Sequence, residues 1–419
     1  MGIIDTLKSR GLFYDASEPE AINKLAAGTP FYVGFDPTAR SLQLGNLVPI
    51  IGTAHLARLG LRPIILFGGA TGAIGDPSGK SEERKLLDRA TIDENIARQT
   101  AQFEAILNRL ELKAEFVNNY DWTADLTTLD FLRDIGKHFT VNYMLQKESV
   151  KTRLASSGLS FTEFSYMILQ AYDFLHLYKT KNCVLQIGGS DQWGNITAGL
   201  ELIRKKIQGT AYALALPLVT DSEGKKFGKS ESGAIWLDPD MTSPYRLHQF
   251  LLNTNDSDVI RFIRQLTFID EQTIEELKEC VKNEPHLRKA QKALADAICT
   301  FVHGEEATKL AKRSAEVLFG GSIEGLSQEQ LEEIFSDVPS SSIRRSDLKK
   351  LSVTELFSRV GLTSSKGEAK KLIQNGGAYI SNKRINDIGL NTTALPDFNS
   401  SLVVLRAGKK SYHLLKIFD

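Results

Sequence analysis

Three polar side chains recur at helical spacing in the segment 160–177. Tyr166, Gln170 and Asp173 occupy positions i, i+4 and i+7, so they lie on one stripe of the predicted helix. Such a stripe is either a face that binds a polar ligand or a tyrosine packed in the core beside two solvated polar residues. The spacing alone favours the second interpretation, and other residues must decide between the two.

A corner between a strand and a helix offers a second candidate site. Residues 31–35 are apolar and aromatic, which predicts a buried strand, and a turn at 36–38 ends it. A helical pattern follows. Because Pro49 fits only the first turn of a helix, this helix must begin close to Gly45. Its free N–H groups and positive dipole end suit an anion such as phosphate.

Two further loops have compositions that suit contact with phosphate. Residues 68–80 are rich in glycine and follow a second apolar run at 63–67. They do not form a P-loop, because Gly75 and Gly79 enclose three residues where that motif requires four. Glycine still lets the backbone approach a ligand closely. The loop 221–230 carries three lysines, and it is an ordinary solvated loop unless a polyanion docks nearby.

The elements that would position these groups alternate along the chain. Apolar runs at 31–35, 63–67 and 183–187 predict strands buried on both faces of a parallel sheet, and periodic, charged segments between them predict helices. One helix, expected over 126–144, has an apolar face that suits a core or a partner subunit. In an open α/β sheet, ligands bind at the carboxyl ends of the strands, where the polar and glycine-rich segments fall.

The last part of the chain changes character twice. Residues 245–319 are helical in pattern throughout, and 321–342 are acidic and end in Pro-Ser-Ser-Ser, which predicts a linker. From residue 343 to 419 there are 14 Lys or Arg against 6 Asp or Glu, a difference of +8. A basic module in a balanced protein is typical of nucleic-acid binding, and the alternative is a domain that only keeps the protein soluble.

The whole sequence sets broad limits. Its 419 residues suffice for two or three domains, and 51 basic residues balance 51 acidic ones, so net charge indicates no partner. Three widely spaced cysteines indicate a reducing compartment, with no disulfide framework or zinc site. Without a signal peptide or a membrane-spanning apolar run, we expect a soluble, cytoplasmic protein with no membrane partner. A trimmed organellar protein would have the same features.

Five motifs occur in an order that points to a family. They are Tyr32-Val-Gly-Phe-Asp-Pro-Thr, Gly75-Asp-Pro-Ser-Gly-Lys, Phe164-Ser-Tyr-x3-Gln-x2-Asp, Gly188-Gly-Ser-Asp-Gln-Trp-Gly-Asn and Lys226-Phe-Gly-Lys-Ser. Together they resemble the motifs of bacterial-type tyrosyl-tRNA synthetases, and the resemblance covers essentially the whole chain. Residues 352–419 are similar to the S-four-like RNA-binding module of that family.

The resemblance implies an α/β fold with several domains. We expect a Rossmann-like parallel-sheet catalytic domain over 1–244, with a dimerisation insertion around 120–180. An all-helical domain on the anticodon side would follow over 245–320, then a linker over 321–351. A small α+β S-four-like RNA-binding domain would close the chain over 352–419.

The implied enzyme is a class I aminoacyl-tRNA synthetase, a tyrosine–tRNA ligase that works as a homodimer. It would activate L-tyrosine with ATP to tyrosyl-adenylate and pyrophosphate, then transfer tyrosine to the 3′ end of tRNA(Tyr). The tyrosine carboxylate is itself the nucleophile, so the enzyme has to supply alignment and charge stabilisation rather than a catalytic Ser, Cys or His.

The resemblance also implies the residues that bind the amino acid. Tyr32 and Asp173 would hydrogen-bond the phenolic OH of tyrosine. The ammonium group would be held by Tyr166, Gln170 and Asp76, and the carboxylate side by Gln192.

A second set of residues would bind ATP and stabilise the transition state. Gln43 and Asn46 stand at the outer positions of the HxGH signature, and Thr38 joins them from the preceding turn. Lys226 and Lys229 belong to the KMSKS loop, whose lysines neutralise the leaving pyrophosphate. Further contacts are expected from Asp36, Gly45, Gly189 and Asp191, with assistance from Lys80 and Arg84. Mg²⁺ would arrive with ATP, and we expect no protein-bound metal.

The chain departs from this family pattern at its signature. Gln43 and Asn46 replace the usual histidines, which keeps an N–H donor at each place and removes any imidazolium charge; Val33 also stands where many relatives have cysteine. The departure is the support for an alternative, a catalytically weakened synthetase scaffold acting as an RNA-binding protein. The complete phenol-binding pair and both loop lysines oppose it. The related tryptophanyl enzyme fits poorly, since an indole pocket has no use for Tyr32 and Asp173.

Overall fold

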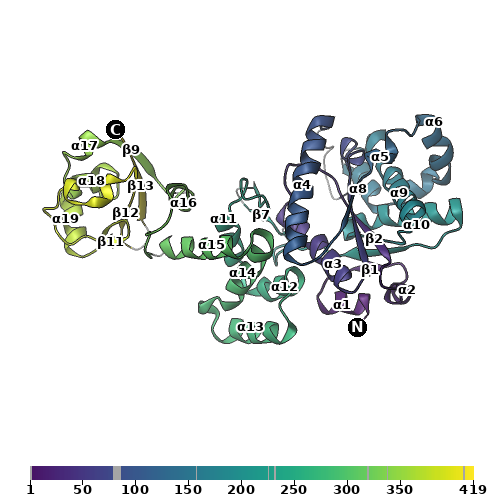
Figure 1. Cartoon of the computed structure of the whole chain (residues 1–419), viewed down its shortest axis with the longest axis horizontal. Coiled ribbons are helices and arrows are strands. Elements are labelled where there is room, and N and C mark those ends of the chain that lie inside the picture. The colour runs from purple at the N-terminus through teal and green to yellow at the C-terminus, as the bar shows by residue number, and fades with distance from the viewer. Residues whose placement is uncertain are drawn as a thin grey trace. The chain divides into compact units, whose positions relative to one another are not determined.

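The computed structural model describes residues 2–78, 86–156, 158–224, 226–230, 233–318, 320–336, 338–408 and 411–419. The chain forms two compact units, residues 1–305 and 306–419. Each unit has buried apolar side chains of its own, and Figure 1 shows the elements of both.

A six-stranded sheet organises the first unit, with strand order β1-β6-β5-β2-β3-β4. β1 is antiparallel to β6, and the other strands pair in parallel. The chain proceeds from β2 to β3 and β4 on one side and returns to β5 and β6 on the other. This reversal between β2 and β5 opens a crevice at their carboxyl ends. The strands are β1 (Asp15–Ala16), β2 (Pro30–Phe35), β3 (Arg62–Phe67), β4 (Glu115–Asn118), β5 (Leu185–Gly189) and β6 (Tyr212–Leu216).

The predicted parallel sheet is confirmed, with small differences in its strands. β2 and β3 each begin one residue before the predicted runs, but β5 begins two residues after 183. The reason is the end of the preceding helix: Asn182 adopts a left-handed conformation with φ of 53°, and the N–H of Cys183 still donates to the Leu177 carbonyl at 3.2 Å. The strands β1, β4 and β6 were not predicted.

Helices cover both faces of the sheet (Figure 1). Successive residues of a strand point to opposite faces, so Phe31, Val33 and Phe35 pack in one core with α3 and α4. Tyr32 packs on the other face, with residues of α9 and α10. The helices on the two faces and at the N-terminus of this unit are α1 (Ile3–Ser9), α2 (Pro19–Asn23), α3 (Leu47–Arg58), α4 (Arg89–Arg109), α9 (Phe161–Lys181) and α10 (Trp193–Ile207).

The single helix predicted over 126–144 is wrong. The segment is broken into short turns because Thr127 and Thr140 each cap a new helix start, and Phe139 between them is extended. Short elements therefore fill the region before α9. They are α5 (Tyr120–Thr123), α6 (Thr128–Asp130), the π-turn η3 (Phe131–Ile135), the 3-10 turn η4 (Gly136–His138), α7 (Val141–Leu145) and α8 (Glu148–Ser156).

The rest of the first unit is helical, as predicted from residue 245 onward. A small hairpin, β7 (Lys229–Ser230) and β8 (Gly233–Ala234), precedes these helices. The helices are α11 (Pro244–Leu252), α12 (Asp256–Leu266), α13 (Glu271–Asn283) and α14 (Lys289–His303), with α15 (Glu305–Leu318) beginning at the boundary between the units.

The second unit contains a five-stranded sheet of order β11-β10-β12-β13-β9. The expected linker over 321–351 is a folded part of this unit, because β9 pairs in parallel with β13 and buries Ile343. Sequence composition concealed this edge strand, since its other residues are serines and arginine. The elements are α16 (Gln328–Ile334), β9 (Ser340–Arg344), α17 (Arg345–Leu348), α18 (Val353–Arg359), α19 (Lys366–Gln374), β10 (Ala378–Ile380), β11 (Lys383–Arg384), β12 (Leu402–Ala407) and β13 (Ser411–Phe418).

Candidate active site

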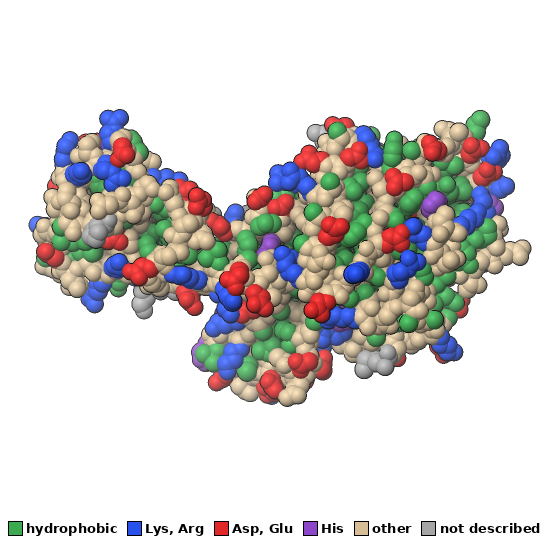
Figure 2. All heavy atoms as spheres, viewed as in Figure 1, with side chains coloured by type: hydrophobic (Ala, Val, Ile, Leu, Met, Phe, Trp, Pro, Cys, Tyr) green, Lys and Arg blue, Asp and Glu red, His purple; other side chains and the backbone are tan. Residues whose placement is uncertain are grey.

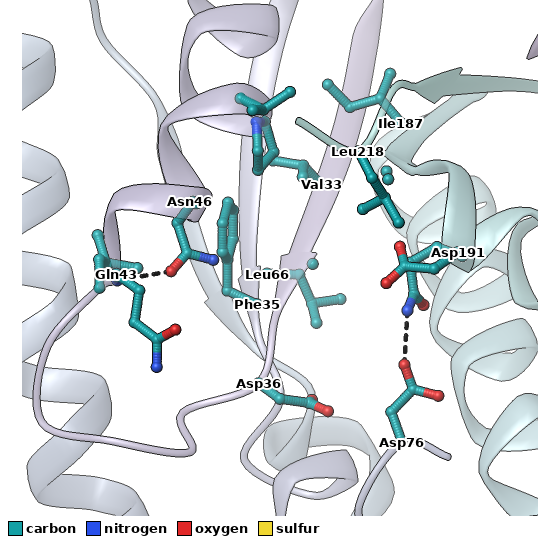
Figure 3. A pocket seen from close by; sticks show the side chains of 18 of the residues that line it. Val33, Phe35, Asp36, Gln43, Asn46, Leu66, Asp76, Ile187, Asp191 and Leu218 are labelled. Atoms are coloured by element: carbon teal, nitrogen blue, oxygen red, sulfur yellow. Dashed lines mark hydrogen bonds between the residues drawn. The ribbon is translucent and has the colours of Figure 1, made fainter. Parts of the chain in front are cut away.

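A cavity of about 380 Å³ lies at the carboxyl ends of β2 and β5. Figure 3 shows Gln43 and Asn46 on one side of it, Asp191 on the opposite side, and Asp36 and Asp76 at the bottom of the view. Fourteen of the residues expected in the site line this cavity: Tyr32, Asp36, Thr38, Gln43, Gly45, Asn46, Asp76, Tyr166, Gln170, Asp173, Gly189, Asp191, Gln192 and Lys226. The side chain of Lys229, together with Lys80 and Arg84, lies outside the described residues.

Tyr32 and Asp173 form a buried polar floor, 1% and 2% exposed. Among the described residues, the Tyr32 hydroxyl has no hydrogen-bond partner. Asp173 accepts from Asn119 Nδ2 and from Trp122 Nε1, each at 2.9 Å, so both of its oxygens are held in place. The edge of the Phe174 ring packs against the Tyr32 ring at 5.3 Å between centroids. The floor thus offers an unused hydroxyl beside a fixed carboxyl group.

Burial shifts the titration of both floor groups. It raises the pKa of Asp173 to about 7, with the charge of Asp36 adding to the rise, while the hydrogen bonds from Asn119 and Trp122 oppose it. Burial, followed by the nearby Asp173, raises the pKa of the Tyr32 phenol well above its usual value. The Tyr32 hydroxyl therefore keeps its proton at neutral pH and can donate as well as accept a hydrogen bond.

A second network holds the end of β2. Asp36 accepts from the Tyr166 hydroxyl and from Thr71 Oγ1, both at 2.8 Å. Asn119 joins this network to the floor, since its Nδ2 atom also donates to Thr71 Oγ1 at 3.1 Å. Tyr166 is 5% exposed and its polar stripe on α9 faces the cavity, so the binding-face interpretation of this stripe is the one that the geometry supports.

The loop after β3 meets the start of α10 through Asp76. Gln192 Nε2 donates to Asp76 Oδ2 at 2.6 Å, which is the dashed contact beside Asp76 in Figure 3. Asn195 Nδ2 donates to Gln192 Oε1 at 3.1 Å and fixes the orientation of that amide. Nearby, burial and then the charge of Asp76 raise the pKa of Asp191, while Lys226 lowers it. A Cβ at Gly189 would lie 2.6 Å from Asp191 Oδ1, so a larger residue there would displace the Asp191 side chain.

The strand-to-helix corner has the predicted form. A 3-10 turn, η1 (Leu44–Asn46), leads into α3, so the helical N–H groups begin within two residues of Gly45. Asn46 Oδ1 accepts from the backbone N–H of Gln43 at 2.8 Å. This contact uses the oxygen of the Asn46 amide within the corner and leaves its N–H₂ group as the polar end for a ligand (Figure 3).

The lysine loop packs directly against this corner. Gly228 has a φ of 87°, and a Cβ at this position would lie 3.0 Å from Leu44 Cβ and 3.2 Å from the Gly45 nitrogen. Glycine is therefore required there on both conformational and steric grounds. The N–H of Leu44 also donates to the Ile235 carbonyl at 2.8 Å. Lys226 lines the cavity beside this contact.

The base of the lysine loop is fixed by α12. Asp258, 2% exposed, accepts from the N–H and the hydroxyl of Ser222, each at 3.0 Å. Arg261 donates to Asp258 Oδ1 and to the Thr220 carbonyl, both at 2.7 Å. One residue after Lys226, the ring of Phe227 packs against those of Phe250 and Phe262.

The sequence did not reveal the residues whose hydrogen bonds orient the predicted site residues. Asn119 and Trp122 follow β4, which was itself not predicted, and no spacing relates them to Asp173. Asn195 closed a recognised motif without an assigned role. Within the described residues, no cluster of three His, Cys, Asp or Glu side chains is arranged to hold a metal ion.

Comparisons with known proteins agree with this geometry. Residues 26–320 match the family model for class I tRNA synthetases of the tryptophan and tyrosine group, and residues 330–415 match the model for the C-terminal domain of tyrosine–tRNA ligases. The match supports the expected fold class, including the separate C-terminal sheet.

Two similar bacterial proteins extend over the full chain. The tyrosine–tRNA ligase of Bacillus caldotenax is 48% identical, covering 99% of this chain and 100% of its own length. That of Roseiflexus castenholzii is 46% identical, covering 99% of each. A C-terminally truncated mitochondrial tyrosyl-tRNA synthetase of Aspergillus nidulans superposes with a TM-score of 0.69 at 29% identity, over 76% of this chain and 94% of that one. The chain belongs to the tyrosine–tRNA ligase family of class I tRNA synthetases.

Proposed function

We propose that the cavity binds tyrosine beside ATP and joins them as tyrosyl-adenylate. The chain is a tyrosine–tRNA ligase: similarity over its full length supports this activity and not the alternative of a weakened scaffold kept for RNA binding. The observation that carries the assignment of the cavity is its floor. A buried Tyr32 hydroxyl without a partner among the described residues, beside a fixed Asp173 carboxyl, suits the phenolic OH of one amino acid.

The other end of tyrosine would lie toward the polar network of α9 and α10. Tyr166, Gln170 and Asp76 would hold its ammonium group, for which Asp76 supplies a buried carboxylate. Gln192, already oriented by Asp76 and Asn195, would lie beside the carboxylate of tyrosine. This arrangement presents the carboxylate toward the nucleotide.

ATP would occupy the side of the cavity formed by the corner and by β5. Asp191 and Gly189 would contact the ribose, and Asp36 and Gly45 the rest of the nucleotide. The phosphates would meet Thr38, Gln43, Asn46 and the lysines Lys226 and Lys229, with the N-terminus of α3 adding its dipole. Mg²⁺ enters as part of the MgATP substrate.

The reaction needs no nucleophile from the protein. A carboxylate oxygen of tyrosine attacks the α-phosphate, the bond to the β-phosphate breaks, and pyrophosphate leaves with the negative charge that Lys226 and Lys229 neutralise. A hydroxyl of the terminal tRNA adenosine then attacks the tyrosyl carbonyl, and AMP leaves. The chain contributes alignment and fixed charges to both steps.

Tyrosine-dependent exchange of pyrophosphate into ATP tests this proposal. The purified protein should catalyse exchange with tyrosine and not with tryptophan or in the absence of an amino acid. Folded protein that shows no exchange would refute the assignment.

The affinity for tyrosine should decrease as the pH is lowered through about 7. Above the Asp173 pKa of about 7, the ionised carboxyl accepts a hydrogen bond from the phenol; below it, the charge that strengthens this bond is lost. Since only the ionised fraction binds well, affinity at pH 6 should be about tenfold below its plateau. Fluorescence titrations with tyrosine between pH 6 and 8.5 would measure this affinity. Asp173→Asn should bind weakly at every pH, and a flat profile for the unmodified protein would contradict the prediction.

The second unit would supply contacts to tRNA(Tyr). Its family match and its excess of basic residues support this role. Deleting residues 306–419 should leave exchange within about twofold of the full chain, because all described cavity residues belong to the first unit. Charging of tRNA should fall by at least about tenfold at physiological salt, where loss of several phosphate contacts weakens RNA binding. Unchanged charging would exclude the second unit as a tRNA contact.

We also propose a cytoplasmic homodimer. Large apolar side chains are exposed between residues 120 and 161, and Figure 2 shows hydrophobic surface where α5, α6 and α9 lie in Figure 1. Exposing such a group of apolar side chains to water is unfavourable for a monomer. The group therefore suits burial against a second copy of the chain. These side chains are Tyr120, Leu129, Leu132, Val141, Leu145, Leu154 and Phe161. No helix in the described part of the chain is long and apolar enough to cross a membrane.

A further inference from the structure

Three side-chain amides on α4 bind the loop that follows β2. Asn95, Gln99 and Gln102 stand at positions i, i+4 and i+7, so they share one face of the helix. Asn95 Nδ2 donates to the Pro37 carbonyl at 2.9 Å, and Gln99 Nε2 donates to the Ala39 carbonyl at 2.7 Å. Gln102 Oε1 accepts from the N–H of Leu42 at 3.0 Å.

These contacts give the backbone of the loop the hydrogen-bond partners that the sheet gives to β2. The last contact from β3 to β2 reaches the Phe35 carbonyl, which accepts from the N–H of Gly68 at 2.9 Å. Beyond it the chain turns away, and the backbone groups of 37–42 that face α4 would lie in the interior without partners. The amides of α4 supply those partners, one to each of three residues.

Two of the three amides are themselves buried, and their helix is anchored to the core of the sheet. Asn95 is 5% exposed and Gln99 is 3% exposed. One residue after Gln102, the ring of Phe103 packs at 4.8 Å from that of Phe35 and at 6.0 Å from that of Phe67. The loop is thus held by a helix that is itself fixed to the core of the sheet.

Gln99 occupies the central place in this arrangement. Its Nε2 atom donates to the carbonyl of Ala39, the residue directly after Thr38. This hydrogen bond fixes the orientation of the amide and leaves Oε1 as its remaining polar atom. Gln99 lines the cavity, and among the described residues its buried Oε1 has no hydrogen-bond partner. The amide therefore lies at the junction between the loop and the cavity.

We propose that Gln99, supported by Asn95 and Gln102, is a positioning residue for adenylate formation. It fixes the loop 37–42, and through the loop it sets the places of Thr38 and Gln43 beside the phosphates of ATP. This inference rests on the proposed function of the cavity. It also explains how a signature with neutral side chains is held in place: the backbone that leads into it is fixed by α4 at Pro37, Ala39 and Leu42.

Gln99→Met tests the proposal, because methionine keeps the length and helix preference of glutamine and removes the donor. We expect kcat for tyrosine-dependent exchange to fall about five- to tenfold, the effect of one lost buried hydrogen bond. The dissociation constant for tyrosine should change by less than about twofold. Asn108→Met is the matched control, since Asn108 is an exposed amide on the same helix; it should leave exchange unchanged.

A double-mutant cycle separates positioning from a general structural role. If Gln99 acts through the loop, Gln99→Met should cost little in a Thr38→Ala background, so the two effects should be clearly less than additive. Full additivity, or a Gln99→Met variant with normal kcat, would overturn the proposal. Asn95→Leu provides a second variant, and thermal melting with tyrosine titration identifies any protein that fails to fold. Absence of exchange in the unmodified chain would instead refute the proposed function.

Discussion

Replacing Asp173 with alanine should erode the preference for tyrosine over phenylalanine by about 30- to 100-fold, a value inside the range of roughly 13- to 160-fold for losing a hydrogen bond to a charged group. In the unmodified protein, phenylalanine would leave both the Tyr32 hydroxyl and the Asp173 carboxyl without a ligand partner. Alanine removes the carboxyl, so tyrosine loses its advantage, whereas the cost of the unpaired Asn119 and Trp122 donors falls on both amino acids alike and cancels in their ratio. Values of kcat/KM for the two amino acids in pyrophosphate exchange measure the change.

Asp121→Ala offers a matched control for this experiment, because Asp121 is an exposed carboxylate on α5 near the same segment. It should leave both values of kcat/KM within about twofold. A preference for tyrosine that survives in Asp173→Ala would remove Asp173 from the amino-acid pocket.

Replacing Lys226 with alanine should slow adenylate formation about 100-fold, the usual cost of losing one preorganised group at a developing negative charge. The affinity for tyrosine should be preserved, since in the proposed function this cavity residue contacts the phosphates of ATP and not tyrosine. Single-turnover formation of tyrosyl-adenylate, compared with fluorescence titration by tyrosine, separates these two quantities.

Lys226→Arg should recover only part of the lost rate, because the positive charge is kept while the planar guanidinium has a different shape and reach. The exposed Lys113 provides a control of equal charge, and Lys113→Ala should behave as the unmodified protein. A normal rate in Lys226→Ala would show that the phosphates are stabilised without this lysine.

The sequence predicted the parts of the fold that local chemistry determines. Pro49 located the start of α3, and the glycine-rich segment 68–80 correctly marked the end of β3, whereas β5 continues through Gly189, two residues beyond the predicted run. The spacing of Tyr166, Gln170 and Asp173 predicted a shared helix face, and the cavity gathers all three. These features are visible from sequence because each depends on residues close together in the chain.

What the sequence did not reveal depends on contacts between distant segments. Asn119 and Trp122 reach Asp173 across more than 50 residues, with separations of 54 and 51, and the amides of α4 reach the loop 37–42 across separations of 58 to 60. No periodicity relates such partners. The strand β9 was hidden for a similar reason: a run of serines becomes a strand only because β13 is beside it.

The floor of the cavity limits how its specificity can be redesigned. Asn119 and Trp122 both direct N–H groups at Asp173, so an apolar residue at this position would leave a buried and a half-buried donor without this acceptor. A pocket for a tyrosine analogue with a capped phenol, such as an ether, therefore requires coordinated replacement of all three residues. Libraries that vary Asp173 alone should yield unstable or poorly selective variants. Libraries that also vary Asn119 and Trp122 search combinations in which the floor can become apolar without stranded donors.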